Sequence, residues 1–221
     1  MEQDLDGRGY VCIKNLLDDD QCRTLISGFD TGTLYRRHII MQRHGYGQGE
    51  YKYFDYPLPD IIAGLREEFY TALAPLANRW SDQLRTGIAY PKTLAEYTRV
   101  CRAAGQIKPT PLILKYETGD YNRLHQDLYG SLMFPMQMTI LLSDPDTDFV
   151  GGEFILTEQR PRQQSRATVI PLRKGDAVIF AVNERPVMGK SRFIRTRMRH
   201  GVSDVRRGHR FTLGVIFHDA A

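Results

Sequence analysis

The sequence predicts an α+β fold, a double-stranded β-helix (jelly roll, cupin-like) with N-terminal helices packed on one sheet. Two patterns within the 221 residues support this prediction. In the first half, apolar residues recur at three- and four-residue spacing, as they do in amphipathic helices. From residue 111 onward, short apolar runs alternate with turn residues, which is typical of antiparallel strands.

The composition favours one compact domain. Hydrophobic residues make up 42% of the chain, enough to bury one substantial core. We expect a single domain, 1–221, in which residues 1–110 supply helical support and a lid and residues 111–221 form the jelly-roll core. Cys12, Cys22 and Cys101 are widely spaced and contain no Cys-x-x-Cys pair, so neither a disulfide framework nor a zinc site is indicated.

The N-terminal residues are acidic and lack the basic and apolar regions of a secretory signal. No apolar run in the sequence is long enough to span a bilayer. We therefore expect a cytoplasmic location without membrane association.

The first half is expected to open with a strand over residues 9–17, followed by helices. The carboxylates at 18–20 can cap a helix over residues 21–29. Residues 60–84 form an amphipathic pattern, which Pro75 is expected to kink or split. Its apolar positions are Ile61, Ile62, Leu65, Phe69, Leu73, Leu76 and Trp80. A shorter helix is predicted over 94–104, ending at Gly105.

In the second half, strands are predicted at residues 112–116, 136–142, 153–157, 167–172 and 177–182, with a tight turn at 174–176. Residues 199–203 and 209–217 are predicted to form a hairpin around a turn at 206–208. If Ser203 pairs with His209, His200 lies opposite Thr212 and diagonal to Arg210 on one face. The alternate residues Phe211, Leu213, Val215 and Phe217 would then face the other way and pack under helices.

Three polar residues near these strands have the chemistry of metal ligands. His125-Gln126-Asp127 precedes His200 by seventy-five residues. If residues 124–128 are extended, His125 and Asp127 project from one face and can reach one ion. Two imidazoles and one carboxylate form the facial set that holds non-haem Fe(II) and leaves coordination positions open. Taken singly, His-x-Asp is a chance occurrence more often than a metal site, and His200 is more often structural.

The pair Arg210 and Thr212 follows the second histidine. A guanidinium can bind a carboxylate through two hydrogen bonds and a nearby hydroxyl can add another, which suits the distal carboxylate of 2-oxoglutarate. Taken alone, Arg210 would more often be a surface cation on an edge strand. The order of the two histidines, the aspartate and the Arg-x-Thr pair along the chain favours interpreting them together as an oxygenase site.

At these residues the chain resembles the 2-oxoglutarate- and Fe(II)-dependent dioxygenases, whose pattern is His-x-Asp, a long interval, His, then Arg-x-Ser or Arg-x-Thr. The short interval from His200 to Arg210 resembles the prolyl-hydroxylase branch, as do 151–154 and Tyr116, nine residues before His125. The resemblance implies that His125, Asp127 and His200 bind Fe(II), and that Arg210, Thr212 and Tyr116 bind 2-oxoglutarate. It also implies O2 as co-substrate and oxidative decarboxylation of 2-oxoglutarate to succinate and CO2, coupled to hydroxylation of a C–H bond.

Further segments resemble a bacterial oxygenase family described as acting oxidatively on damaged DNA. These are residues 50–59, 109–112, 119–122, 125–130, 157–165 and 216–220. The longer interval between the last histidine and the arginine in the AlkB demethylases is not reproduced. This resemblance implies oxidative demethylation of alkylated nucleobases in single-stranded or damaged DNA.

Two other functions fit the same residues. The prolyl-hydroxylase-like spacing and the modest net charge also suit a hydroxylase of a small molecule, a free amino acid or a protein side chain. A non-catalytic metal-binding β-barrel is a third candidate, against which the complete Arg-x-Thr anchor argues.

Two basic segments bear on the substrate. Residues 34–59 combine cations and aromatic residues around a glycine-rich stretch, and we weigh a lid that stacks on a base equally with a solvated connector. A second stretch near His200 is either a phosphate track or a solvated face. It contains Arg185, Lys190, Arg192, Arg195, Arg197, Arg199, Arg206 and Arg207. The whole-chain charge of +4 permits nucleic-acid contact without requiring it.

Overall fold

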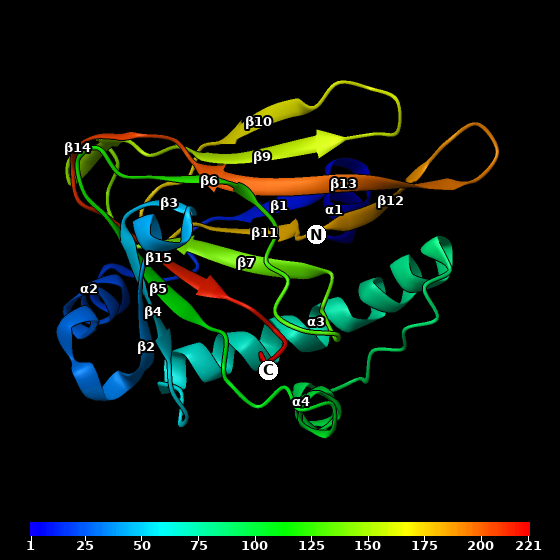
Figure 1. The fold of residues 1–221 in the computed structure, drawn as a ribbon, viewed down its shortest axis with the longest axis horizontal. Coiled ribbons are helices and arrows are strands. Elements are labelled where there is room, and N and C mark those ends of the chain that lie inside the picture. The colour runs from blue at the N-terminus through cyan, green and yellow to red at the C-terminus, as the bar shows by residue number, and fades with distance from the viewer.

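The computed structural model describes residues 1–221 and shows two antiparallel sheets, with three of the four α-helices on one side (Figure 1). The seven-stranded sheet runs, in order across it, β1 (Tyr10–Ile13), β11 (Ala177–Ala181), β7 (Met136–Leu141), β15 (Arg210–Val215), β5 (Leu112–Tyr116), β4 (Glu50–Phe54) and β2 (Tyr35–Ile40). The six-stranded sheet consists of β10 (Arg166–Ile170), β9 (Phe154–Gln159), β13 (Phe193–Val202), β6 (Tyr121–His125) and β3 (Gly47–Gln48), with β12 (Glu184–Met188) paired to β13. A small ladder joins β14 (Val205–Gly208) to β8 (Phe149–Gly151).

The helices are α1 (Glu2–Arg8), α2 (Asp19–Ser27), α3 (Asp60–Leu84) and α4 (Leu94–Ala103), with short 3-10 turns η1 (Gly28–Asp30), η2 (Gly32–Leu34) and η3 (Met41–His44). The first helix, α1, lies beside the strands β1 and β12 (Figure 1). The predicted capping of α2 is confirmed, because the Asp18 carboxylate accepts from the Gln21 backbone N–H at 2.8 Å. None of these helices combines the length and the apolar character needed to cross a membrane.

Helix α3 packs its apolar face against the seven-stranded sheet, as predicted. Leu73 and Leu76 share one buried cluster with Leu213 and Val215 of β15. Of the kink or split expected at Pro75, the split is excluded, since α3 continues unbroken from Asp60 to Leu84, and the kink stays a prediction. Residues on both sides of the proline are buried in the same core, and this packing outweighs the backbone hydrogen bond that proline cannot make.

The prediction that residues 199–203 and 209–217 form a hairpin is wrong. Strand β13 lies in the six-stranded sheet, whereas β15 is hydrogen-bonded between β5 and β7 in the other sheet. Residues 205–208 form strand β14, which crosses between the sheets, so Ser203 does not pair with His209. Both edges of β15 are already occupied, which leaves no place for a hairpin partner. The expected burial of Leu213, Val215 and Phe217 beneath the helices is nevertheless confirmed.

The first 110 residues contribute four strands as well as helices. Strands β2 and β4 pair at one edge of the seven-stranded sheet, and β3 pairs with β6 of the other sheet. Residues 34–59 therefore span both sheets. Strands β2, β3, β4, β12 and β14 were not predicted, because they are short and carry polar or charged residues where a buried strand would carry apolar ones. The short helix α1 was not predicted either.

Candidate metal and co-substrate site

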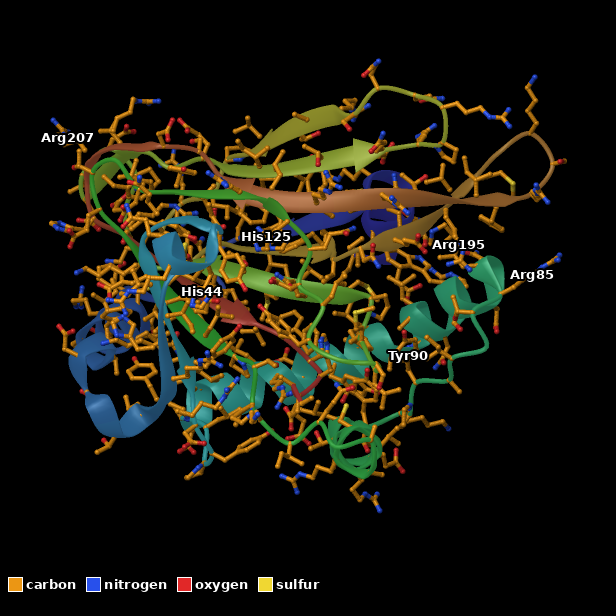
Figure 2. The ribbon with its side chains drawn as sticks, in the orientation of Figure 1. His44, Arg85, Tyr90, His125, Arg195 and Arg207 are labelled. Carbon is orange, nitrogen blue, oxygen red and sulfur yellow. The ribbon has the colours of Figure 1, made fainter.

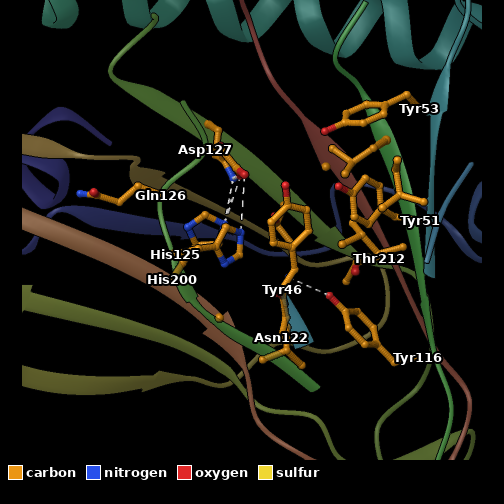
Figure 3. Close-up of a pocket in the computed structure, with 18 of the residues that line it drawn as sticks. Tyr46, Tyr51, Tyr53, Tyr116, Asn122, His125, Gln126, Asp127, His200 and Thr212 are labelled. Atoms are coloured by element: carbon orange, nitrogen blue, oxygen red, sulfur yellow. Dashed lines mark hydrogen bonds and ion pairs between the residues drawn. The ribbon is translucent and has the colours of Figure 1, made fainter. Parts of the chain in front are cut away.

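A cavity of about 390 Å³ lies between the two sheets, and all six predicted site residues line it (Figure 3). His125 ends β6, Asp127 lies in the following loop, and His200 is on β13. Arg210 and Thr212 on β15 and Tyr116 on β5 come from the facing sheet. The candidate metal ligands and the candidate 2-oxoglutarate-binding residues therefore do line one cavity, as predicted. They reach it from two facing sheets, not from one hairpin.

The three candidate ligands are brought together by strand pairing. His200 and His125 are directly opposite on β13 and β6, and their ring centroids are 4.2 Å apart. Asp127 Oδ1 lies 3.5 Å from His125 Nε2, and Asp127 Oδ2 lies 3.3 Å from His200 Nε2. Strand β6 stops at His125, so residues 124–128 are not one strand as expected, but the loop still directs Asp127 to the same point.

The donor set fits a divalent metal of the Fe(II) kind. One potential ligand atom from each of these three residues lies within 4.8 Å of the others. Two imidazole nitrogens and one carboxylate oxygen on one side of a cavity leave the opposite side open to further ligands. Nδ1 of the buried His200 has no hydrogen-bond partner, while the rings of Phe180 and His125 pack against this imidazole and hold its position.

The pKa shifts of Asp127 and His200 suit metal binding. Burial alone would raise the pKa of Asp127, but hydrogen bonds from His125 and His200 outweigh it and hold this pKa well below its usual value. Burial, together with the charge of His125, lowers the pKa of His200. A charged carboxylate and a neutral imidazole are the forms that bind a cation. For His125, burial opposes the charged form, but the hydrogen bond and the charge of Asp127 outweigh it and raise the pKa, so an ion at this site would compete with a proton.

Two residues that the sequence did not single out hold the carboxylate of Asp127. The Tyr129 hydroxyl donates to Oδ1 at 2.8 Å, and Gln137 Nε2 donates to Oδ2 at 2.8 Å. Groups that orient a ligand in this way tune metal affinity. The signal for Gln137 was present in the sequence, because it is a long polar residue in a mostly apolar strand, 136–141, in which every residue is buried.

Arg210 is the most unusual residue of the cavity. Its side chain is 1% exposed, yet no carboxylate lies within ion-pair distance. Nη1 donates to Thr212 Oγ1 at 3.3 Å, Nε has no partner, and burial lowers the pKa of Arg210 to about 10. A buried cation without a counter-ion is costly, so this position is suited to an anionic ligand.

Tyr116 and Gly152 shape the surroundings of this guanidinium. Tyr116 is directly opposite Arg210 on the paired strand, and its hydroxyl accepts from Asn122 Nδ2 at 3.3 Å. Burial raises the pKa of Tyr116 to about 12, so its phenol stays a hydrogen-bond donor. Gly152 has φ of +60°, and a Cβ there would lie 2.8 Å from Arg210 Cδ, so glycine leaves the room that the arginine needs.

Residues 34–59 supply the outer wall of the cavity. Tyr46 stands between the ligand triad and Tyr51 in Figure 3 and is half exposed. Its ring stacks on His44 with centroids 5.3 Å apart and an interplanar angle of 20°. Arg37 also lines the cavity and is exposed. His44 and His125, labelled in Figure 2, thus line one cavity from different segments.

Known proteins match most of the chain. Residues 49–220 match the model of a family described as an oxygenase catalysing oxidative methylation of damaged DNA. Two uncharacterized proteins from strains of Mycobacterium tuberculosis are each 46% identical over 168 residues, which cover 76% of this chain and 72% of each relative.

Solved structures share the fold at low identity. A prolyl-4-hydroxylase from Pseudomonas putida has a TM-score of 0.56 at 14% identity, covering 100% of this chain and 97% of its own. An oxidoreductase of the 2OG-Fe(II) oxygenase family from Burkholderia pseudomallei has a TM-score of 0.50 at 14% identity. The match covers 100% of this chain and 91% of the oxidoreductase. The chain is therefore an enzyme with the jelly-roll fold of the 2-oxoglutarate/Fe(II) oxygenases, and it belongs to the oxygenase family described as catalysing oxidative methylation of damaged DNA.

Proposed function

We propose that the chain is a 2-oxoglutarate- and Fe(II)-dependent dioxygenase that hydroxylates a C–H bond of an alkylated nucleobase in DNA. His125, Asp127 and His200 would hold Fe(II), and Arg210, Thr212 and Tyr116 would bind the distal carboxylate of 2-oxoglutarate. The observation that carries the chemistry is the buried, unpaired Arg210 in the same cavity as the His-Asp-His cluster.

The bound ion and co-substrate would supply the oxidation, in which 2-oxoglutarate, O2 and R–H become succinate, CO2 and R–OH. The chain's own residues position and shield the reactants. Tyr129 and Gln137 keep both Asp127 oxygens oriented. The rings of Tyr116 and Phe149, whose centroids lie 5.5 and 5.8 Å from Arg210 Cζ, limit water around this guanidinium, where low polarity strengthens a carboxylate–guanidinium pair.

Three features support a nucleobase as the substrate. The family description refers to damaged DNA. The stacked pair His44 and Tyr46 offers aromatic surface at the mouth, where an unpaired base can stack. Asp127 is the sole carboxylate among the residues that line the cavity, while Arg37 adds an exposed cation, so the mouth favours an anionic ligand such as a nucleotide.

A hydroxylase of a small molecule, a free amino acid or a protein side chain is the second candidate. The ten-residue interval from His200 to Arg210, together with Tyr116 opposite Arg210, favours it. Such a substrate would use the same metal and co-substrate site and differ in what enters past Tyr46.

The proposal is tested by anaerobic difference spectroscopy with Fe(II) and 2-oxoglutarate, followed by O2 exposure and quantification of succinate and formaldehyde. Methylated and unmethylated single-stranded oligonucleotides are compared, with His200→Ala as the control. We expect a metal-to-ligand band and succinate release that methylated DNA stimulates. A band without DNA stimulation would redirect the search to the second candidate, and no band in folded protein would refute the site.

A further inference from the structure

The charge of the chain is concentrated in one part of the fold. Residues 154–202, which run from β9 to β13, contain eleven Lys and Arg against three Asp and Glu, a balance of +8. The whole chain carries +4, so all other residues together carry −4. This asymmetry is much stronger than the modest total charge suggests.

The three carboxylates of this region are already engaged. Glu158 pairs with Arg185 and Arg160, Asp176 with Lys14, and Glu184 with Arg195. Arg197 and Arg199, by contrast, have no ion-pair partner, and both side chains are exposed. Their charge is therefore available to an external anion.

These two arginines lie on the outer face of the six-stranded sheet. Along β13, Thr196, Met198 and His200 are buried while the alternate residues are exposed, which places the arginines opposite to the cavity. The residues beside them on β9 are neutral, since Arg197 faces Gln159 and Arg199 faces Thr157. On β12, Glu184 is opposite Arg197, but its carboxylate is engaged by Arg195 at 2.7 Å.

Around Arg199 this outer face is open to solvent, and the C-terminal end of α3 reaches only its far end, where the Leu84 carbonyl accepts from Arg195 Nη2 at 2.8 Å. Ile155 on β9 pairs with Gly201 on β13 and with Val169 on β10. Val169 therefore projects from the same face of the sheet as the two arginines, and it is 55% exposed. A second copy of the chain would bring like charges together here, whereas a polyanion would be attracted.

The outer face of β13 and the mouth of the cavity are joined by the loop that follows β6. Arg199 directly precedes the candidate ligand His200, and Gln126 Nε2 donates to the Met198 carbonyl at 2.9 Å, between the two arginines. The Gln126 loop also carries Leu128, which lines the cavity and is 50% exposed. A chain bound on β13 is thus one sheet edge away from the mouth.

We propose that the backbone phosphates of a single-stranded nucleic acid bind Arg197 and Arg199 on the outer face of β13, so that the strand turns past Leu128 and its target base enters the cavity. This inference rests on the proposed nucleobase substrate and adds where the rest of the strand binds. Phosphate contacts of this kind fix position without reading sequence.

The test compares the double variant Arg197→Ser/Arg199→Ser with the matched control Lys92→Ser/Arg99→Ser, which removes two exposed cations next to and within α4. Fluorescence anisotropy with a labelled methylated single-stranded oligonucleotide is measured across a NaCl series. We expect the double variant to raise Kd by about tenfold or more and to reduce the salt slope by roughly 1 to 2, since each phosphate contact contributes about one unit. The control should change Kd by less than about twofold, as expected for cations that make no phosphate contact.

Further arms separate this inference from the proposed function. Arg197→Lys/Arg199→Lys should retain most of the affinity, because a phosphate needs the charge more than the guanidinium shape. If wild-type protein binds and oxidises methylated DNA and the serine double variant matches it, the phosphate track is refuted while the proposed function stands. If wild-type protein shows the 2-oxoglutarate band but neither binds nor is stimulated by DNA, the nucleobase substrate fails and this inference with it. Arginine-dependent binding to phosphatidylserine vesicles, without DNA binding, would overturn it in favour of a membrane surface.

Discussion

The two sheets that enclose the cavity differ in what covers their outer faces. On the seven-stranded sheet, Leu213 and Val215 are fully buried against helix α3. On the six-stranded sheet, Val169 and Leu124 are 55% and 47% exposed. One sheet therefore has two buried faces, whereas the other has one buried face and one open to solvent (Figure 1).

This difference matches the chemistry that each sheet carries. The covered sheet holds Arg210, whose attraction for a carboxylate is strong only in a rigid setting of low polarity. The open sheet holds His125 and His200, and the His125 side chain is 33% exposed at the sheet edge. We infer that burial serves the invariable co-substrate and that exposure serves a larger substrate that must approach from outside.

The largest effect on activity is expected from a substitution on the inner face of the six-stranded sheet, which lines the cavity. His200→Ala removes one of three candidate ligands, so succinate formation should fall by at least about 10³-fold, since the metal carries the hard chemistry. Thr157→Ala, on the outer face of the same sheet, is the control and should keep full activity. Titration of each protein with Co(II), followed by its visible absorption, would show whether the loss arises from metal binding. Wild-type metal affinity in His200→Ala would contradict the ligand assignment.

Substitutions on the outer faces of the two sheets should have different effects on the free energy of unfolding. Leu213→Ala creates a cavity under α3 and should lower the free energy of unfolding by about 2 to 5 kcal/mol. Val169→Ala removes an exposed side chain and should change it by no more than about 0.5 kcal/mol. Urea denaturation of both variants measures the contrast. Equal losses would show that the six-stranded sheet is covered in solution.

Arg210→Met should distinguish function from stability within the covered sheet. Removing the guanidinium should weaken 2-oxoglutarate binding by about 2 to 4 kcal/mol, the usual cost of losing one partner of a buried charge pair. The same change should leave the ligand-free protein as stable as wild type or more so, because an unpaired buried cation is lost. Thermal unfolding with and without 2-oxoglutarate tests both points. Retained 2-oxoglutarate affinity would refute the role of Arg210.

The most gradual effect concerns His218, which follows β15 and is 1% exposed. Burial lowers its pKa from 6.5 to about 4, so the unfolded chain binds one more proton between these values. Stability should consequently fall by about 1 kcal/mol per pH unit as the pH drops from 6.5 to 4, and this term should be absent above 6.5. His218→Gln should flatten the slope, because it removes this proton-binding group. Unfolding of the metal-free proteins across this pH range provides the comparison.

Local patterns predicted much of the fold. The spacing of apolar residues located α3 and α4, and the Asp18 carboxylate marked the start of α2. Alternation along 210–217 correctly identified the side of β15 that packs in the helix-covered core, even though its predicted partner strand was wrong. Periodicity records which face of an element is buried, and that information lies within the element itself.

The sequence by itself determined the chemical types at the site and the order in which they occur, because His-x-Asp, His and Arg-x-Thr are readable as residues. Only the tertiary structure decided that His200 and Arg210 face each other from different sheets, that Tyr129 and Gln137 hold Asp127, and that Arg210 has no counter-ion. Strand partners and the burial of a charge depend on contacts between residues far apart in the chain. No local pattern specifies those contacts, because each depends on which edges and faces the rest of the fold leaves free.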